Sequence, residues 1–66
     1  MTTANQHRTL PARDLLRGDL IRHEGAWWTV GEAKPDWGTV VVLDPAGEYV
    51  TTYNHGDPVD VVRISR

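Results

Sequence analysis

Short stretches of apolar or alternating residues, each followed by turn residues, make up the chain after Gly18. Residues 39–43 (TVVVL) form a β-branched run that is too short for a helix and is typical of a buried strand. Residues 26–33 alternate between two faces of an extended chain. The pattern predicts strands at 20–22, 26–33, 39–43, 48–53 and 59–64.

The segments between these strands are rich in turn-forming residues. The predicted turns are residues 23–25, 34–38, 44–47 and 54–58, and each contains glycine, proline or both. Five short strands at intervals of roughly ten residues can bury one face each by forming a pair of sheets or a small barrel. We therefore expect an all-β fold.

The beginning of the chain follows a different pattern. Residues 1–9 are polar and show no periodicity, so we expect a disordered tail. Pro11 near the start and Gly18 just past the end suit one short helical turn at residues 12–16. So short a helix must dock on the rest of the protein, through Leu15 or Leu16. Residues 10–66 are expected to form a single domain.

The composition limits how such a domain can be stabilised. A chain of 66 residues holds one small core, and the absence of cysteine excludes disulfides and thiolate metal sites. No stretch approaches the roughly 18 apolar residues of a membrane span. Residues 1–6 are polar and uncharged, unlike a signal peptide. We therefore expect a soluble, cytoplasmic protein without a membrane partner.

Two stretches of the sequence resemble a known family. The stretch DLLRGDLI, with EGAWWTV after it, and then LDPAGE and TTYNHGDPV, follow the order of strands and glycine turns in SH3-like barrels of translation proteins. The first domain of bacterial elongation factor P has the most similar layout. The resemblance covers roughly residues 13–64 and implies a five-stranded SH3-like small barrel with one short helical turn before its first strand.

The same resemblance argues against a role in peptide-bond formation. In elongation factor P, the loop between the second and third strands presents a functional lysine. The matching loop of this chain carries Asp36 and Trp37, with Lys34 at its entrance, and we expect no counterpart of the further domains of that factor. The resemblance therefore bears on the fold rather than on the activity.

The residues offer little for catalysis. The chain has no cysteine, and its only serine is Ser65, next to the C-terminus. The three histidines, His7, His23 and His55, do not have the spacing of a zinc site on a helix. His23 and His55 fall in predicted turns, where a solvated side chain is the simpler interpretation. We expect a non-catalytic protein with no metal and no cofactor.

The aromatic residues are the strongest candidates for binding. Three tryptophans in so short a chain cannot all be buried by alternation. Trp28 shares a strand face with Val30 and is assigned to the core, which turns Trp27 outward. Trp37 either caps an open end of the barrel or binds a partner.

The two tyrosines depend on the phase of their strand. If Val50 faces inward, Tyr49 and Tyr53 both face solvent; if the phase is inverted, both enter the core. With the first arrangement, Trp27, Trp37 and both tyrosines would form a platform for stacking or for protein docking.

Basic residues could line one side of this platform. They are Arg13, Arg17, Arg22 and Lys34. Aromatic residues interleaved with arginine suit single-stranded nucleic acid, because bases stack on the rings while arginine neutralises phosphates. The alternative is a solvated charged surface, with these residues paired to Asp14, Asp19 and Glu24.

Two functions are compatible with these features. The first is a small accessory or regulatory module that docks on another protein, including a second copy of itself, through exposed aromatics. The second is binding of single-stranded RNA or DNA. The net charge of −2, with two arginines against five acids in residues 35–66, weakens unaided binding to nucleic acid and favours the protein partner.

Overall fold

The computed structural model describes residues 5–64 and consists almost entirely of antiparallel strands. The strands are β1 (Asn5–Pro11), β2 (Leu20–His23), β3 (Ala26–Thr29), β4 (Glu32–Asp36), β5 (Thr39–Leu43), β6 (Tyr49–Asn54) and β7 (Pro58–Ile64). One 3-10 turn, η1 (Ala12–Asp14), follows β1. The predicted all-β class is therefore confirmed.

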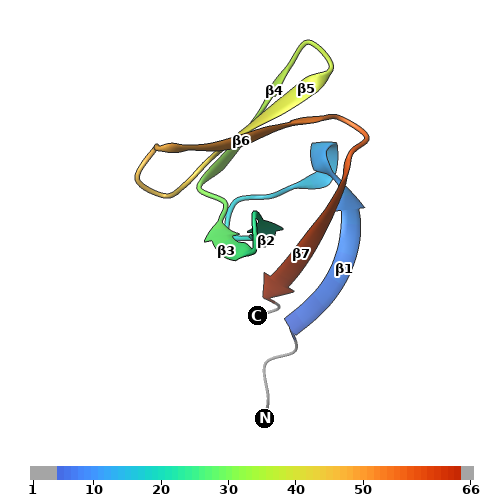
Figure 1. The fold of residues 1–66 in the computed structure, drawn as a ribbon, viewed down its shortest axis with the longest axis vertical. Helices are drawn as coiled ribbons and strands as arrows, with labels where there is room; N and C mark the ends of the chain where they lie inside the picture. The colour runs from blue at the N-terminus through green and yellow to red at the C-terminus, as the bar shows by residue number, and fades with distance from the viewer. Residues whose placement is uncertain (1–4, 65–66) are drawn as a thin grey trace.

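The strands form two sheets (Figure 1), and buried residues of both belong to one core cluster. The order in the four-stranded sheet is β1-β7-β2-β3, and the order in the three-stranded sheet is β4-β5-β6. β1 pairs with β7 along its whole length, from Asn5 opposite Ile64 to Pro11 opposite Pro58. Figure 1 shows β1 and β7 side by side on one flank, with β2 and β3 beyond them.

Alternating residues from both sheets make the core. The second and fourth residues of β5 are buried, as are the second and fourth of β7. The buried hydrophobic residues are Ala12, Leu15, Ile21, Val30, Val40, Val42, Val59 and Val61. Most of them are β-branched, in keeping with the preference of such side chains for a pleated, half-buried surface.

The structure does not show the five strands expected for an SH3-like small barrel. The described residues contain seven strands in two sheets and no closed barrel. One reason is that the predicted strand at 26–33 divides at Gly31, where the chain passes from β3 in the first sheet to β4 in the second. A side chain on Gly31 would overlap the backbone of Asp44 and lie 2.6 Å from Pro45 Cα. Alternation alone cannot reveal this close approach.

The second additional strand is β1. The sequence predicted a disordered tail over residues 1–9, but Asn5–Pro11 form a strand. The prediction failed because β1 is held by its backbone pairing with β7 and not by an apolar pattern of its own. Residues 1–4 of the predicted tail lie outside the described residues.

Two local predictions need smaller corrections. The helical turn expected at 12–16 is a 3-10 turn over Ala12–Asp14, and of its two candidate anchors Leu15 is buried while Leu16 is exposed. The loop expected at 34–38 is shorter, because β4 continues to Asp36. Pro35 is tolerated there since β4 is an edge strand.

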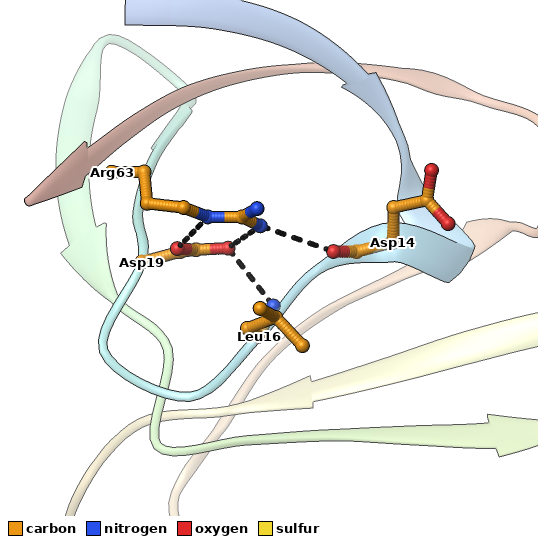
Figure 2. A network of polar contacts seen from close by, with 4 residues as sticks. All are labelled: Asp14, Leu16, Asp19 and Arg63. Carbon is orange, nitrogen blue, oxygen red and sulfur yellow. Dashed lines mark hydrogen bonds and ion pairs between the residues drawn. The ribbon is translucent and has the colours of Figure 1, made fainter. Parts of the chain in front are cut away.

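A partly buried ion pair, with Asp19 inside and Arg63 reaching the surface, joins the segment after η1 to the last strand (Figure 2). Asp19 is only 3% exposed. Its two carboxylate oxygens accept hydrogen bonds from Arg63 Nε at 2.9 Å and Arg63 Nη2 at 2.8 Å. The Leu16 N–H donates to the same carboxylate at 2.9 Å, and Arg63 Nη2 also donates to the Asp14 carbonyl at 3.2 Å.

The ionisation of this pair follows from its hydrogen bonds. Burial raises the pKa of Asp19, but the hydrogen bonds from Arg63 and Leu16 and the positive charge of Arg63 together outweigh it, so the pKa lies below its usual range. The hydrogen bond to Asp19 in turn raises the pKa of Arg63. Both groups are therefore charged near neutral pH.

Replacement of Gly31 by alanine should destabilise the protein strongly, because the added carbon would overlap backbone atoms that cannot rotate away. The matched control is Gly56→Ala, where the nearest atom is the flexible Arg13 Nη1 at 3.9 Å. We expect Gly31→Ala to lower the free energy of unfolding by more than the about 1–3 kcal/mol typical of overpacking, and so to lower the urea midpoint strongly. Equal midpoints for the two variants would contradict the close approach at Gly31.

Candidate functional site

Three side chains gather on the outer face of the four-stranded sheet. The register places Arg22 of β2 opposite Trp27 of β3, and the Arg22 guanidinium lies 5.9 Å from the centre of the indole. The ring of His7, from β1, meets Trp27 edge-on with centroids 6.1 Å apart. Since β7 and β2 lie between β1 and β3, the contact with His7 means that the Trp27 side chain extends across the outer face of these two strands. Trp27 remains 44% exposed.

The sequence predicted that Trp28 lies in the core, but in the structure it does not. It lies opposite Ile21 and therefore on the inner face of the sheet, but it is 39% exposed. The reason is its position on β3, the last strand of the sheet, where no described strand covers it from the side. The Trp28 indole N–H donates to the His23 carbonyl at 3.2 Å.

Trp37 occupies the turn between β4 and β5. Asp36 and Thr39 pair on either side of this two-residue turn, and the Thr39 hydroxyl donates to the Asp36 carbonyl at 2.7 Å. Trp37 has a φ of 21° and is 99% exposed. Figure 1 shows this turn at the top of the view, beyond the rest of the described chain. Trp37 therefore does not cap the fold.

The two tyrosines do not share a face, contrary to both phases considered for their strand. A register shift leaves Tyr49 opposite Leu43 and Thr51 opposite Val42, so that Val50 is an extra residue in β6. Because of this β-bulge, Val50 and Tyr53 both pack against the core.

The bulge gives the tyrosines different surroundings. Tyr53 is half-buried and its ring lies edge-on to His23, with centroids 6.3 Å apart. Burial, and to a lesser extent the Asp57 carboxylate, raises the pKa of Tyr53. Tyr49 is 64% exposed, and its hydroxyl lies 2.9 Å from the Thr52 hydroxyl. Of the two tyrosines, Tyr49 is the more accessible to a partner.

The basic residues are dispersed. Of the four predicted basic residues, Arg22 is the one that lies over an aromatic ring, that of Trp27. Arg13 belongs to η1, Arg17 lines an open cavity of about 590 Å³ beside Leu16, and Lys34 lies on β4 opposite Val41. The predicted platform of four aromatic and four basic residues is therefore divided over separate parts of the molecule.

No arrangement for metal binding occurs within residues 5–64: they contain no group of three His, Asp or Glu side chains placed to hold an ion. The contact between His23 and Glu24 is long, at 3.9 Å, and Glu24 is exposed.

His55 has a buried Nε2 without a hydrogen-bond partner among residues 5–64. Its backbone is well paired, since it donates to Gly38 and accepts from Arg13.

Comparisons of the chain with family models, curated proteins and solved structures gave no match. The resemblance to SH3-like barrels of translation proteins therefore stays a prediction. No helix within the described part of the chain has the length and apolar character needed to cross a membrane.

His7 was not predicted as a surface residue next to Trp27. It lay in the segment expected to be disordered, and its contact with Trp27 arises only when β1 joins the sheet. No local pattern could have indicated this contact, because the two residues meet across strands that are distant in sequence.

The different positions of the two tyrosines can be tested by truncation. Tyr53→Ala should lower the free energy of unfolding by about 2 kcal/mol, because a half-buried ring packed on the core is lost. Tyr49→Ala should cost about 0.5 kcal/mol, since its ring is largely in solvent. Urea unfolding followed by tryptophan fluorescence measures both values. Equal losses would contradict the bulge at Val50.

Proposed function

We propose that this protein is a small non-catalytic interaction module, accessory or regulatory in role, that docks on another protein through the β4–β5 turn. The observation that supports this proposal best is the position of Trp37, which is 99% exposed at the tip of a paired hairpin. A tryptophan there contributes nothing to the core, whereas tryptophan is among the residues that dominate binding energy at protein interfaces.

The backbone of the turn strengthens the proposal. Trp37 and Gly38 both have positive φ, at 21° and 78°, as in the two-residue turns that favour asparagine followed by glycine. A bulky residue rarely adopts such a conformation. A large apolar side chain is thus held in solvent at a position that a small polar residue would fill better, which is typical of a functional constraint.

The surroundings of the turn are suited to presenting this side chain. The Gly38 carbonyl accepts a hydrogen bond from the His55 N–H at 2.9 Å, which ties the turn to the segment between β6 and β7. A partner therefore meets a turn that is already ordered, and the entropy lost on binding is small. Burial of one tryptophan removes roughly 150–250 Å² from water, enough to anchor a small interface.

Binding of single-stranded nucleic acid is the second candidate. The observation in its favour is the group formed by His7, Arg22 and Trp27, where a cation and two rings share one exposed sheet face. Base stacking on such rings contributes roughly 1–3 kcal/mol per base. The dispersal of Arg13, Arg17 and Lys34 and the net charge of −2 leave few phosphate contacts beside this face.

The substitution Trp37→Asn separates binding from folding. It creates an asparagine–glycine turn, so the melting temperature should stay the same or rise, while docking on the partner should be lost. We would immobilise the wild type and the variant, quantify proteins captured from an extract of the source cells, and then measure affinity with the purified partner. The matched control is Trp27→Thr, which removes the other outward-facing tryptophan.

The outcomes of this experiment are distinct. A partner retained by Trp27→Thr and lost by Trp37→Asn supports the proposal. A partner bound equally by Trp37→Asn and the wild type contradicts it. If the Trp27 indole shifts in NMR spectra on addition of mixed single-stranded oligonucleotides, and the shift fades between about 50 and 200 mM salt, the second candidate is favoured instead.

A further inference from the structure

The two sheets have four edge strands, and they differ in how they are protected. The edges are β1 and β3 in one sheet and β4 and β6 in the other. Unpaired edges invite pairing with another chain, and proteins discourage this with charges, proline and bulges. β4 contains Lys34 and Pro35, β6 contains the bulge at Val50, and β1 contains Arg8 and ends at Pro11.

β3 has none of these features. Its sequence is Ala-Trp-Trp-Thr, without charge, proline or glycine, and all four residues are exposed. It pairs with β2 alone, and no other described strand lies along its free side. In Figure 1, β3 lies on the flank of its sheet away from β1. Its shortness is the one protective feature it retains.

The register fixes which backbone groups of β3 are free. His23 and Ala26 close the two-residue turn between β2 and β3, so they form a hydrogen-bonded pair. Pairs alternate along antiparallel strands, which leaves the N–H and C=O of Trp27 and Thr29 pointing away from β2. The same alternation continues beyond the strand, since the Val30 N–H donates back to the Asp19 carbonyl at 2.8 Å.

From this arrangement we propose that a second copy of the chain pairs with β3, antiparallel, about a two-fold axis at Trp28. Trp27 of each copy then exchanges both backbone hydrogen bonds with Thr29 of the other. The free groups of β3 are symmetric about Trp28, so the edge is complementary to itself. An uncharged edge also allows two identical strands to approach without repulsion.

The side chains fit this pairing. The axis makes the two Trp28 residues a directly opposed, non-hydrogen-bonded pair, the closest kind in antiparallel sheets. Opposed aromatic residues stabilise such pairs by roughly 0.2–1 kcal/mol beyond alanine. The pairing covers the exposed part of Trp28, which its place on the last strand leaves in solvent. Four backbone hydrogen bonds and this contact make a small interface, so the dimer is weak and depends on concentration.

This dimer is independent of the proposed docking through Trp37. Trp37 lies in the other sheet, between β4 and β5, and stays exposed in either copy. One assembly would therefore present two Trp37 turns, and failure of the dimer leaves the proposed function untouched.

The test uses the full chain and its oligomeric state. Sedimentation velocity over a wide concentration range should show a monomer–dimer equilibrium, with a tryptophan exciton couplet in the far-ultraviolet circular dichroism that grows with the dimer. Trp28→Lys and Trp28→Glu should each weaken self-association at least about tenfold, because like charges then face each other across the axis. An equimolar mixture of the two variants should restore the dimer as a heterodimer.

Two further variants keep the test decisive. Thr29→Pro removes an N–H that points to the free edge and leaves pairing with β2 intact, so it should also yield monomer. Tyr49→Glu places a charge on the exposed surface of the other sheet and should leave the dimer unchanged. A wild type that stays monomeric at the highest soluble concentration, or dimers that persist in Trp28→Lys and Thr29→Pro, would overturn the proposal.

Discussion

The ion pair between Asp19 and Arg63 is the contact on which the arrangement of the strands depends. It joins the segment that leads into β2 to β7, the strand that pairs with both β1 and β2. In a chain of 66 residues without cysteine, no disulfide can supply this link. Asp19 is 3% exposed and Arg63 28%, so loss of Arg63 leaves a buried carboxylate without its partner. Breaking a fully buried pair costs about 3–5 kcal/mol, and the cost here lies toward the lower end of that range, still a large part of a small domain's stability.

With this framework fixed, the tryptophans are left at the periphery, each for its own reason. Trp27 lies across an outer sheet face, Trp28 lies on the edge strand β3, and Trp37 lies in a hairpin turn. The core is filled by smaller aliphatic residues instead. The aromatic residues are therefore available for contacts outside the chain, which is the physical basis for both proposed interfaces.

The sequence was sufficient to predict the elements whose local pattern of apolar, polar and turn residues is distinctive. The β-branched run of β5, the alternation in β7 and the turn between β2 and β3 are visible in the pattern. The features that the sequence could not reveal depend on backbone segments that are distant in the chain. β1 is ordered by pairing with β7, and position 31 must be glycine because the Asp44 backbone leaves no room for a side chain. The bulge at Val50 changes which residues of β6 face inward. Trp27, Trp37 and Tyr49 were therefore identified correctly as exposed aromatics, whereas the half-buried Tyr53, the exposed Trp28 and the division of these residues over separate surfaces were not.

The most direct test of the role of this ion pair is the pH dependence of unfolding for wild type, Asp19→Asn and the control Asp14→Asn, whose exposed carboxylate accepts no hydrogen bond from Arg63 and adds only the smallest contribution to the raised pKa of that arginine. The lowered pKa of Asp19 stabilises the fold above the pKa of the unfolded chain, and this contribution is lost as the pH falls through the folded-state pKa. Asp19→Asn should therefore be much less stable at neutral pH and lose less stability on acidification, while Asp14→Asn follows the wild type. Parallel curves for wild type and Asp19→Asn would contradict the central role of this pair.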